Sequence, residues 1–499
     1  MLIALAFLAA APLEFADQAM PGLWIGAPTP FTGLPATNYL QADFDDDGEI
    51  DLLLPGAVYF QRQGLFPEAM RVLWPAGHTG GEADGFGSAL YVRTHNWLSV
   101  YTYVEGQWHT QSSQPVEWPG TQLQGAPQTG GDRPTHFRRF AHDLDGDHIP
   151  ELLDLDARGI HVFRLQGGRY EPAGILDILP PMTLAPAGPQ EIWPAGSRRI
   201  VLPELEMACR LVVMAGTVSL ITQTEIPDGV VFRRESIALE VGPDGLFASA
   251  GRSVSESAPI PPHLRPCNLN GDNTLDFAGG RWMLSTSSPL PSPLYETWAS
   301  LDGGATFHIE RTPAFRNFRP NCSFLDFDGD GDLDMVAEST RIMEGGPREA
   351  VNRYLTETRL HHTLRILPQD RGAFHSSRAL AFNVVFELDA PPITGGPMLD
   401  RYQAGALLNL TGDFNGDGFL DLVSRKSATR LEVHLARGWS GFDLEPAAEI
   451  GIPANADVAV ADINGDGYAD ILLQWVDESV DGSAGTPQTV AYFALGDRP

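Results

Sequence analysis

The chain has 499 residues, of which 43% are hydrophobic, and this combination permits one large repeat architecture or several domains and excludes wholesale disorder. Its formal net charge of −31 argues against nucleic acid or an anionic membrane as a partner, because both are bound by basic patches. The 52 glycines and 40 prolines favour many short strands and turns over long helices.

The N-terminus, MLIALAFLAAAPLEF, is an apolar run that ends in Ala9-Ala10-Ala11, a small-residue pattern typical of a signal-peptide cleavage site. The usual positively charged residues ahead of the run are missing. We interpret residues 1–19 as a signal peptide and expect a protein that is secreted, or held at the cell surface or in the periplasm. Since no stretch reaches 18 consecutive apolar residues, we expect no membrane span.

An acidic nine-residue pattern then recurs along the chain, with side-chain oxygens at positions 1, 3, 5 and 9 and usually glycine at position 6. The intervals between copies are 100, 125, 58, 87 and 49 residues, which indicate a unit of about 50 to 60 residues. The two longest intervals then span two units each. This gives eight units within residues 20–499, and seven if one degenerate unit is miscounted. The predicted units begin near residues 40, 85, 140, 195, 262, 320, 405 and 455.

The residues around each acidic copy predict strands. Short runs rich in Val, Ile and Leu stand on both sides, such as DVAVAD before the last copy and ADILL after it. Two more strand-like runs follow in the better units, for example AVYF (57–60) and MRVLW (70–74). Four antiparallel strands per repeated unit predict an all-β fold, a single β-propeller with eight blades favoured. The acidic copies would be loops between the first two strands of several blades.

Two segments depart from the repeat. The last unit has only three strand-like runs, and we expect LWIGAP (23–28) to supply its fourth strand, pairing the start of the chain with its end and covering two sheet edges. An insertion at about 345–375 contains PREAVNRYLTETRLHH, with Pro347 at a plausible first helical position. This sequence predicts a short helix or a long excursion in the sixth unit.

The acidic loops carry the ligand type that calcium prefers. Ca²⁺ takes six to eight oxygens, and position 7 would add a backbone carbonyl. Zinc is disfavoured because no Cys or His is regularly placed, and magnesium ranks second. The absence of Glu at position 12 and the flanking strands exclude an EF-hand. The predicted ligands are Asp43, Asp45, Asp47, Glu49, Asp51, Asp143, Asp145, Asp147, Ile149, Glu151, Asn268, Asn270, Asp272, Asp276, Asp326, Asp328, Asp330, Asp332, Asp334, Asp413, Asn415, Asp417, Phe419, Asp421, Asp462, Asn464, Asp466, Tyr468 and Asp470.

The six predicted sites are unequal. The loops that begin at 43, 326, 413 and 462 keep the whole pattern, whereas His148 and Asn273 replace the glycine in the loops that begin at 143 and 268. We therefore predict up to six Ca²⁺ sites, four of them strong. The alternative, that these are turns that merely bend the chain, does not require an acid at position 9, and all six copies have one.

At ADFDDDGEIDLLL, LDFDGDGDLDMV, GDFNGDGFLDLVS and ADINGDGYADILL the sequence resembles the FG-GAP / VCBS repeat family, which includes the propeller of integrin α-subunits and many secreted bacterial proteins. The resemblance spans residues 40–499, and GFGSA (85–89) is similar to the FG element of such repeats. It implies a calcium-binding propeller that acts as a recognition or adhesion module for an extracellular carbohydrate or protein. The protein would be a monomer with no nucleic-acid partner.

The alternative function is a calcium-dependent polysaccharide lyase or another carbohydrate-active enzyme, since some eight-bladed rhamnogalacturonan lyases are similar calcium-loop propellers. No spacing picks out a catalytic set among Arg138, Arg139, His142, Arg353, Tyr354, His361, His362 and Arg371. His361 and His362 are neighbours on one strand, so at most one can face a given ligand. The chain's three cysteines do not make a disulfide scaffold; we expect small buried residues, with one bridge as the alternative.

Overall fold

The computed structural model divides the chain into two compact units, residues 38–262 and residues 1–37 with 263–499. We refer to them as the middle unit and the terminal unit. The structure describes residues 13–20, 23, 25–28, 35–37, 39–54, 57–73, 82–94, 96–118, 136–137, 140–156, 159–177, 184–185, 199–200, 209–214, 217–226, 229–242, 246–261, 264–267, 269–270, 276–285, 292–313, 322–340, 347–356, 358–370, 373–387, 408–476 and 487–495.

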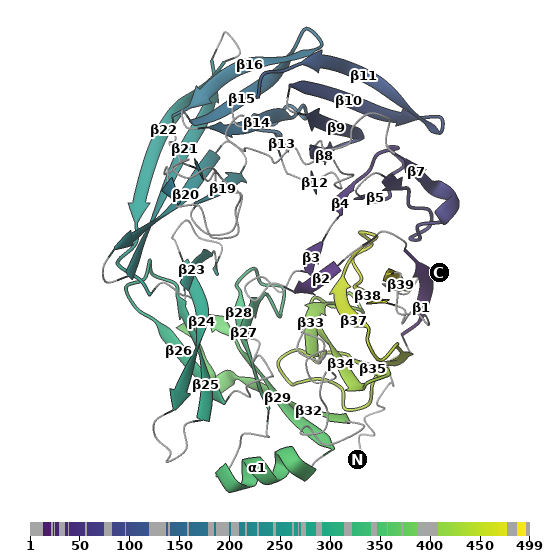
Figure 1. Cartoon of the computed structure of the whole chain (residues 1–499), viewed down its shortest axis with the longest axis vertical. Coiled ribbons are helices and arrows are strands. Elements are labelled where there is room, and N and C mark those ends of the chain that lie inside the picture. Colours follow the sequence, from purple (N-terminus) through teal and green to yellow (C-terminus); the bar gives the residue numbers. More distant parts are fainter. Residues whose placement is uncertain are drawn as a thin grey trace, which may run out of the picture. The chain divides into compact units, whose positions relative to one another are not determined.

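The middle unit contains four antiparallel sheets of four strands, each built from strands that follow one another along the chain (Figure 1). A short strand, β12 (His136–Phe137), adds to the second sheet by parallel pairing with β8. A separate two-stranded pair joins β17 (Leu184–Ala185) to β18 (Arg199–Ile200). The four sheets consist of β4 (Leu40–Ala42), β5 (Asp51–Leu54), β6 (Ala57–Tyr59) and β7 (Arg71–Leu73); β8 (Glu82–Phe86), β9 (Ala89–Thr94), β10 (Trp97–Val104) and β11 (Gln107–Pro115); β13 (Ala141–His142), β14 (Glu151–Asp156), β15 (Gly159–Gln166) and β16 (Arg169–Leu176); and β19 (Cys209–Met214), β20 (Thr217–Ile226), β21 (Gly229–Val241) and β22 (Phe247–Glu256).

The terminal unit contains the other four sheets, also antiparallel and four-stranded. Two short pairs lie beside them, β2 (Ile25–Pro28) with β3 (Pro35–Thr37) and β30 (Gln369–Asp370) with β31 (Ala373–Phe374). The sheets consist of β23 (Leu264–Cys267), β24 (Asp276–Ser285), β25 (Ser292–Ser300) and β26 (His308–Pro313); β27 (Cys322–Leu325), β28 (Asp334–Thr340), β29 (Arg359–Leu367) and β32 (Leu380–Glu387); β33 (Leu408–Gly412), β34 (Asp421–Ser427), β35 (Arg430–His434) and β36 (Ala448–Gly451); and β37 (Asp457–Ala461), β38 (Asp470–Val476), β39 (Pro487–Ala494) and β1 (Phe15–Ala19).

Eight four-stranded antiparallel sheets, each one blade, confirm the predicted all-β fold class: an eight-bladed β-propeller. The predicted helix is also present, because α1 (Pro347–Thr356) begins at the expected proline and lies between β28 and β29. Two single turns of 3₁₀ helix complete the described elements, at Glu68–Met70 and Ser376–Arg378.

The strand that completes the last blade was predicted wrongly. The start of the chain does pair with its end, but the pairing strand is β1, whose Phe15 lies opposite Ala494 and whose Ala19 lies opposite Val490. Residues 25–28 form β2, which pairs with β3. The prediction took LWIGAP for the fourth strand because it lies just ahead of the first full unit, but the strand that pairs is FADQA, whose side chains are partly or fully exposed as suits the outer strand of a blade. Strand β1 lies inside the segment 1–19 that the sequence assigned to a signal peptide.

The core of each unit lies between neighbouring sheets, where alternate side chains from two blades meet. In the terminal unit, Leu325 and Phe327 pack in one buried cluster with Leu408 and Leu422 of the next blade. Close packing there demands glycine at the end of β33: a Cβ on Gly412 would lie 2.4 Å from Ala469 and 2.5 Å from Val460. The backbone of one blade thus contacts the next with no space for a side chain.

Candidate metal sites in the acidic loops

All six acidic loops lie where the sequence placed them, between the first and second strands of a blade. We name each loop by its first residue. Loops 43 and 143 belong to the middle unit, and loops 268, 326, 413 and 462 to the terminal unit. Of loop 268 the structure describes only Leu269, Asn270 and Asp276, so Asn268 and Asp272 lie outside the described residues.

The position-1 carboxylate organises each described loop by accepting backbone N–H groups. In loop 413, Asp413 Oδ1 accepts from Gly416 at 2.7 Å and Oδ2 accepts from Gly418 at 2.8 Å. The residue at position 6 must then adopt a left-handed conformation, with φ of 88° at Gly418 and 90° at Gly331. His148 takes the same region in loop 143, at φ 65°, so the turn survives the replacement of glycine.

Position 5 supports the same turn. Its Oδ1 accepts the N–H of position 7, at 2.9 Å from Glu49 to Asp47 and from Phe419 to Asp417. The side chain of Glu49 leaves the loop and accepts the N–H groups of Gln63 and Gly64. The predicted role of Glu49 as a ligand therefore rests on its backbone carbonyl, as it does for the other position-7 residues.

Position 9 has a structural role that the sequence did not reveal. This side chain is buried in all six loops, with an exposed fraction of 2% or less. One of its oxygens accepts the N–H of position 2 at 2.7 to 3.2 Å, for example Phe414 N–H to Asp421. In four loops the other oxygen accepts an N–H at or near the end of the third strand, such as Ala436. The hairpin itself therefore needs an acid at position 9, so this acid is not by itself a sign of a metal site.

The position-9 carboxylates have perturbed acidities. The pKa of Asp51, Asp334 and Asp421 is raised from an ordinary 3.8 to about 7, chiefly by burial and also by neighbouring loop carboxylates, against the opposing effect of the N–H donors. Burial likewise raises the pKa of Glu151 to about 7. A cation among the loop oxygens would favour the ionised carboxylates and reverse this shift.

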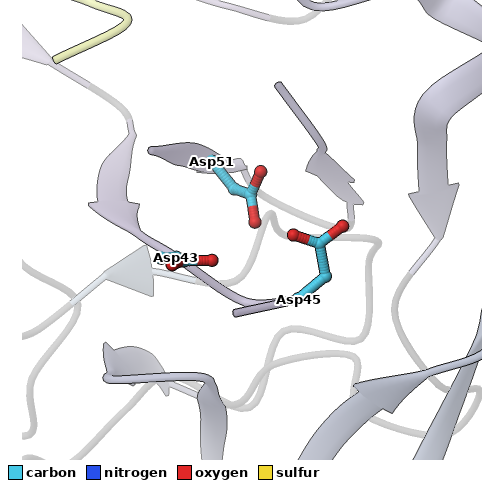
Figure 2. A group of neighbouring side chains, drawn as sticks. All are labelled: Asp43, Asp45 and Asp51. Carbon is cyan, nitrogen blue, oxygen red and sulfur yellow. The ribbon is translucent and has the colours of Figure 1, made fainter. Parts of the chain in front are cut away.

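Three loops bring carboxylates together as metal ligands require. Ligand oxygens lie within 4.8 Å of one another in the groups Asp43–Asp45–Asp51, Asp143–Asp145–Glu151 and Asp326–Asp328–Asp330. Figure 2 shows the first group, whose three carboxylates turn toward one shared space. In addition, Oδ1 of Asp45 and of Asp328 is shielded from solvent and accepts no hydrogen bond from the described residues. These donor sets fit a hard divalent cation such as Ca²⁺.

The loops differ in what faces positions 3 and 5. Arg62 forms ion pairs with Asp45 and with Asp47, the latter at 2.8 Å. Arg164 lies 2.5 Å from Asp145 and 3.0 Å from Asp147.

In the terminal unit, neutral groups donate hydrogen bonds at these positions. In loop 326 the indole of Trp439 donates to Asp328 Oδ2 at 2.9 Å. In loops 413 and 462 the position-3 amide donates to position 5, at 3.1 Å from Asn415 to Asp417 and 3.0 Å from Asn464 to Asp466. The sequence did not reveal these three residues, because each arginine lies outside the nine-residue pattern, 15 to 19 residues from its carboxylates, and Trp439 lies 111 residues from Asp328.

The residues considered for catalysis do not assemble into a described site. His362 is buried, at 4% exposure, while His361 is partly exposed, which is the alternation expected of neighbours on a strand. His142 is partly buried at the end of β13. The structure does not describe Arg138, Arg139 and Arg371. It also does not describe the side chains of Arg353, Tyr354 and the three cysteines.

The fold and its loops define the class of protein: a β-propeller whose blades carry acidic hairpin loops. Within that class, residues 413–473 match the family model for an FG-GAP-like repeat, and this segment contains loops 413 and 462. The match confirms, for this segment, the resemblance to FG-GAP repeats noted in the sequence, and the segment lies within a β-propeller. No curated protein matched the chain in a sequence comparison. Within the described residues, no helix is both long enough and apolar enough to cross a membrane.

Proposed function

We propose that this protein is an exported, calcium-binding recognition module. FG-GAP repeats on a β-propeller fit a binding or adhesion module, and a propeller presents many loops to a ligand. The fold alone does not define the ligand, because propellers serve many functions.

The observation that carries the calcium proposal is loop 326. Its Asp326, Asp328 and Asp330 place three carboxylate oxygens within 4.8 Å, and one shielded oxygen of Asp328 has no described donor. These side chains, together with the backbone carbonyl of Asp332, would hold the ion. Bound calcium would offset the repulsion among the carboxylates and add its binding energy to the stability of the hairpin.

Thermal unfolding with calcium, with magnesium and with a chelator tests this proposal. The wild type should melt at a higher temperature in calcium, and the double variant Asp326→Ala, Asp330→Ala should lose part of that increase. Asp302→Ala is the matched control, because Asp302 caps a turn through Thr306 and Ser300 outside the acidic loops. It should lower the melting temperature equally in calcium and in chelator. A wild-type melt that is the same in both conditions would refute calcium binding.

We propose an extracellular carbohydrate or protein as the partner. Incubating the exported form with a panel of polysaccharides in calcium tests for both retention and cleavage. Retention without new chain ends supports a carbohydrate-binding propeller, and no retention favours a protein partner. New unsaturated chain ends would refute the binding-module proposal in favour of a lyase.

A further inference from the structure

Two of the acidic loops already contain a cation supplied by the chain. Arg164 of β15 contacts three side chains of loop 143, at positions 3, 5 and 9, with distances of 2.5 Å to Asp145, 3.0 Å to Asp147 and 3.5 Å to Glu151. Arg62 contacts positions 3 and 5 of loop 43. The guanidinium thus pairs with some of the side chains that could hold a metal ion, namely Asp45 in loop 43 and both Asp145 and Glu151 in loop 143.

The guanidinium of Arg164 is held in place from two sides. Its side chain is only 19% exposed, and its Cζ lies 5.6 Å from the ring of Phe247, a buried residue of β22. The aromatic face and the carboxylates together fix the planar group, as in cation–π packing. Arg62 is less enclosed, with 36% of its side chain exposed. It is held by Asp45, Asp47 and the carbonyl of Gln61.

Loops 326 and 413 have the same turn, in which the position-1 carboxylate accepts the N–H of position 6. Among the described residues, no basic side chain forms an ion pair with the carboxylates of these two loops. Arg437 forms its ion pair with Asp443, at 2.7 and 2.8 Å, and Asp417 and Asp421 of loop 413 contribute only smaller electrostatic interactions to its raised pKa. Within the described part of the chain, the carboxylates of loops 326 and 413 are therefore not paired with a guanidinium, unlike those of loops 43 and 143.

We propose that Arg62 and Arg164 act as built-in cations that replace calcium in loops 43 and 143. A dication placed among the same oxygens would be repelled by the guanidinium, or would have to displace it from its ion pairs. Calcium would then bind in the terminal unit, at loops 326 and 413, and the hairpins of the middle unit would be stable without it. This inference rests on the proposed calcium binding and narrows where the ion acts.

Hydrogen-exchange mass spectrometry of the full chain, with calcium and with chelator, provides the test. In the wild type, calcium should slow exchange in peptides that cover loops 326 and 413 and leave loops 43 and 143 unchanged. Arg164→Gln and Arg62→Gln should each create calcium-dependent protection in their own loop, with affinity raised at least about tenfold because the repelling charge is gone. The gain should be larger for Arg164→Gln, since that guanidinium is more enclosed and contacts three carboxylates.

Arg437→Gln is the matched control for loops 43 and 143, because it removes an arginine of the terminal unit whose ion pair is with Asp443; it should create no new protection in those two loops. If the wild type shows equal protection in loops 43, 143, 326 and 413, the arginine proposal is overturned while calcium binding stands. Protection nowhere in the wild type, with a gain in the two arginine variants, would refute the calcium proposal for the terminal unit and support the arginine proposal. Protection in no loop of any variant would overturn both. The wild-type comparison does not depend on the folding of any variant.

Discussion

The carboxylate at position 9 offers the sharpest separation between a structural and a metal-binding role. Asp421 is fully buried and accepts N–H groups from Phe414 at 2.8 Å and from Ala436 at 2.7 Å. Replacing it with alanine leaves two buried donors without a partner. Each such donor costs about 1 to 3 kcal/mol, so Asp421→Ala should lose about 2 to 6 kcal/mol of unfolding free energy.

This loss should occur without calcium. Urea unfolding in chelator, followed by tryptophan fluorescence, should show most of the loss, and calcium should change it little. Asp421→Asn keeps an acceptor oxygen and loses the charge whose burial raises the pKa to about 7, so it should be less destabilising than alanine in chelator. Asp443→Asn is the control, because Asp443 lies in the same blade outside the loop. If Asp421→Ala unfolds like the wild type in chelator and differs from it only in calcium, position 9 is a metal ligand and the structural argument fails.

Three further outcomes follow from burial and packing. Burial lowers the pKa of His362 from 6.5 to about 4, so the neutral ring contributes fully to stability above pH 6.5. This contribution, up to about 3 kcal/mol, is lost as the pH falls from 6.5 toward 4. His362→Asn should make the unfolding free energy less dependent on pH over that range, and an unchanged pH profile would contradict a buried neutral ring. A chain that begins at Met20 lacks β1 and should melt well below one that begins at Pro12, and equal melting temperatures would show that β1 does not stabilise the last blade. Gly412→Ala should lower the unfolding free energy in chemical denaturation by about 1 to 3 kcal/mol, because its Cβ would overlap the next blade. Gly451→Ala, at an open position of the same sheet, should lower it far less. Equal losses in the two variants would refute the close approach of the blades at Gly412.

The start of the chain contributes strand β1 to the last blade. The signal peptide was predicted to cover residues 1–19, but β1 needs Phe15, which packs edge-on against Phe414 at 5.9 Å between ring centroids. We therefore expect cleavage near Ala9-Ala10-Ala11, and N-terminal sequencing of the exported protein checks it. A mature chain that begins at residue 20 would show that the last blade does not use β1.

The repeat itself was readable from the sequence because it depends on local chemistry. A hairpin whose first carboxylate accepts N–H groups within five residues, and whose glycine must take positive φ, leaves a strict nine-residue signature. Short apolar runs on both sides then predict strands, and the spacing predicts the number of blades. Pro347 marked the start of α1 for the same local reason.

Contacts between distant residues could not be read in this way. In the terminal unit successive loops are joined through their backbones: Leu333 donates to Leu269 at 2.6 Å and Leu420 donates to Phe327 at 3.0 Å. These bonds depend on how one blade packs on the next. They join backbone groups that nearly all residue types share, so the sequence does not indicate them.

The two arginines show the same limit. In the strand pairing, Arg62 stands three residues beyond Tyr59, the partner of Leu52, whereas Arg164 stands one residue beyond Phe163, the partner of Leu152. They reach equivalent carboxylates from different points along the third strand, so no common spacing links them to their loops. The sequence determined that each loop gathers negative charge because its ligand oxygens lie within nine residues. Only the tertiary structure decided which loops meet an arginine, because that depends on side chains packed from a separate strand.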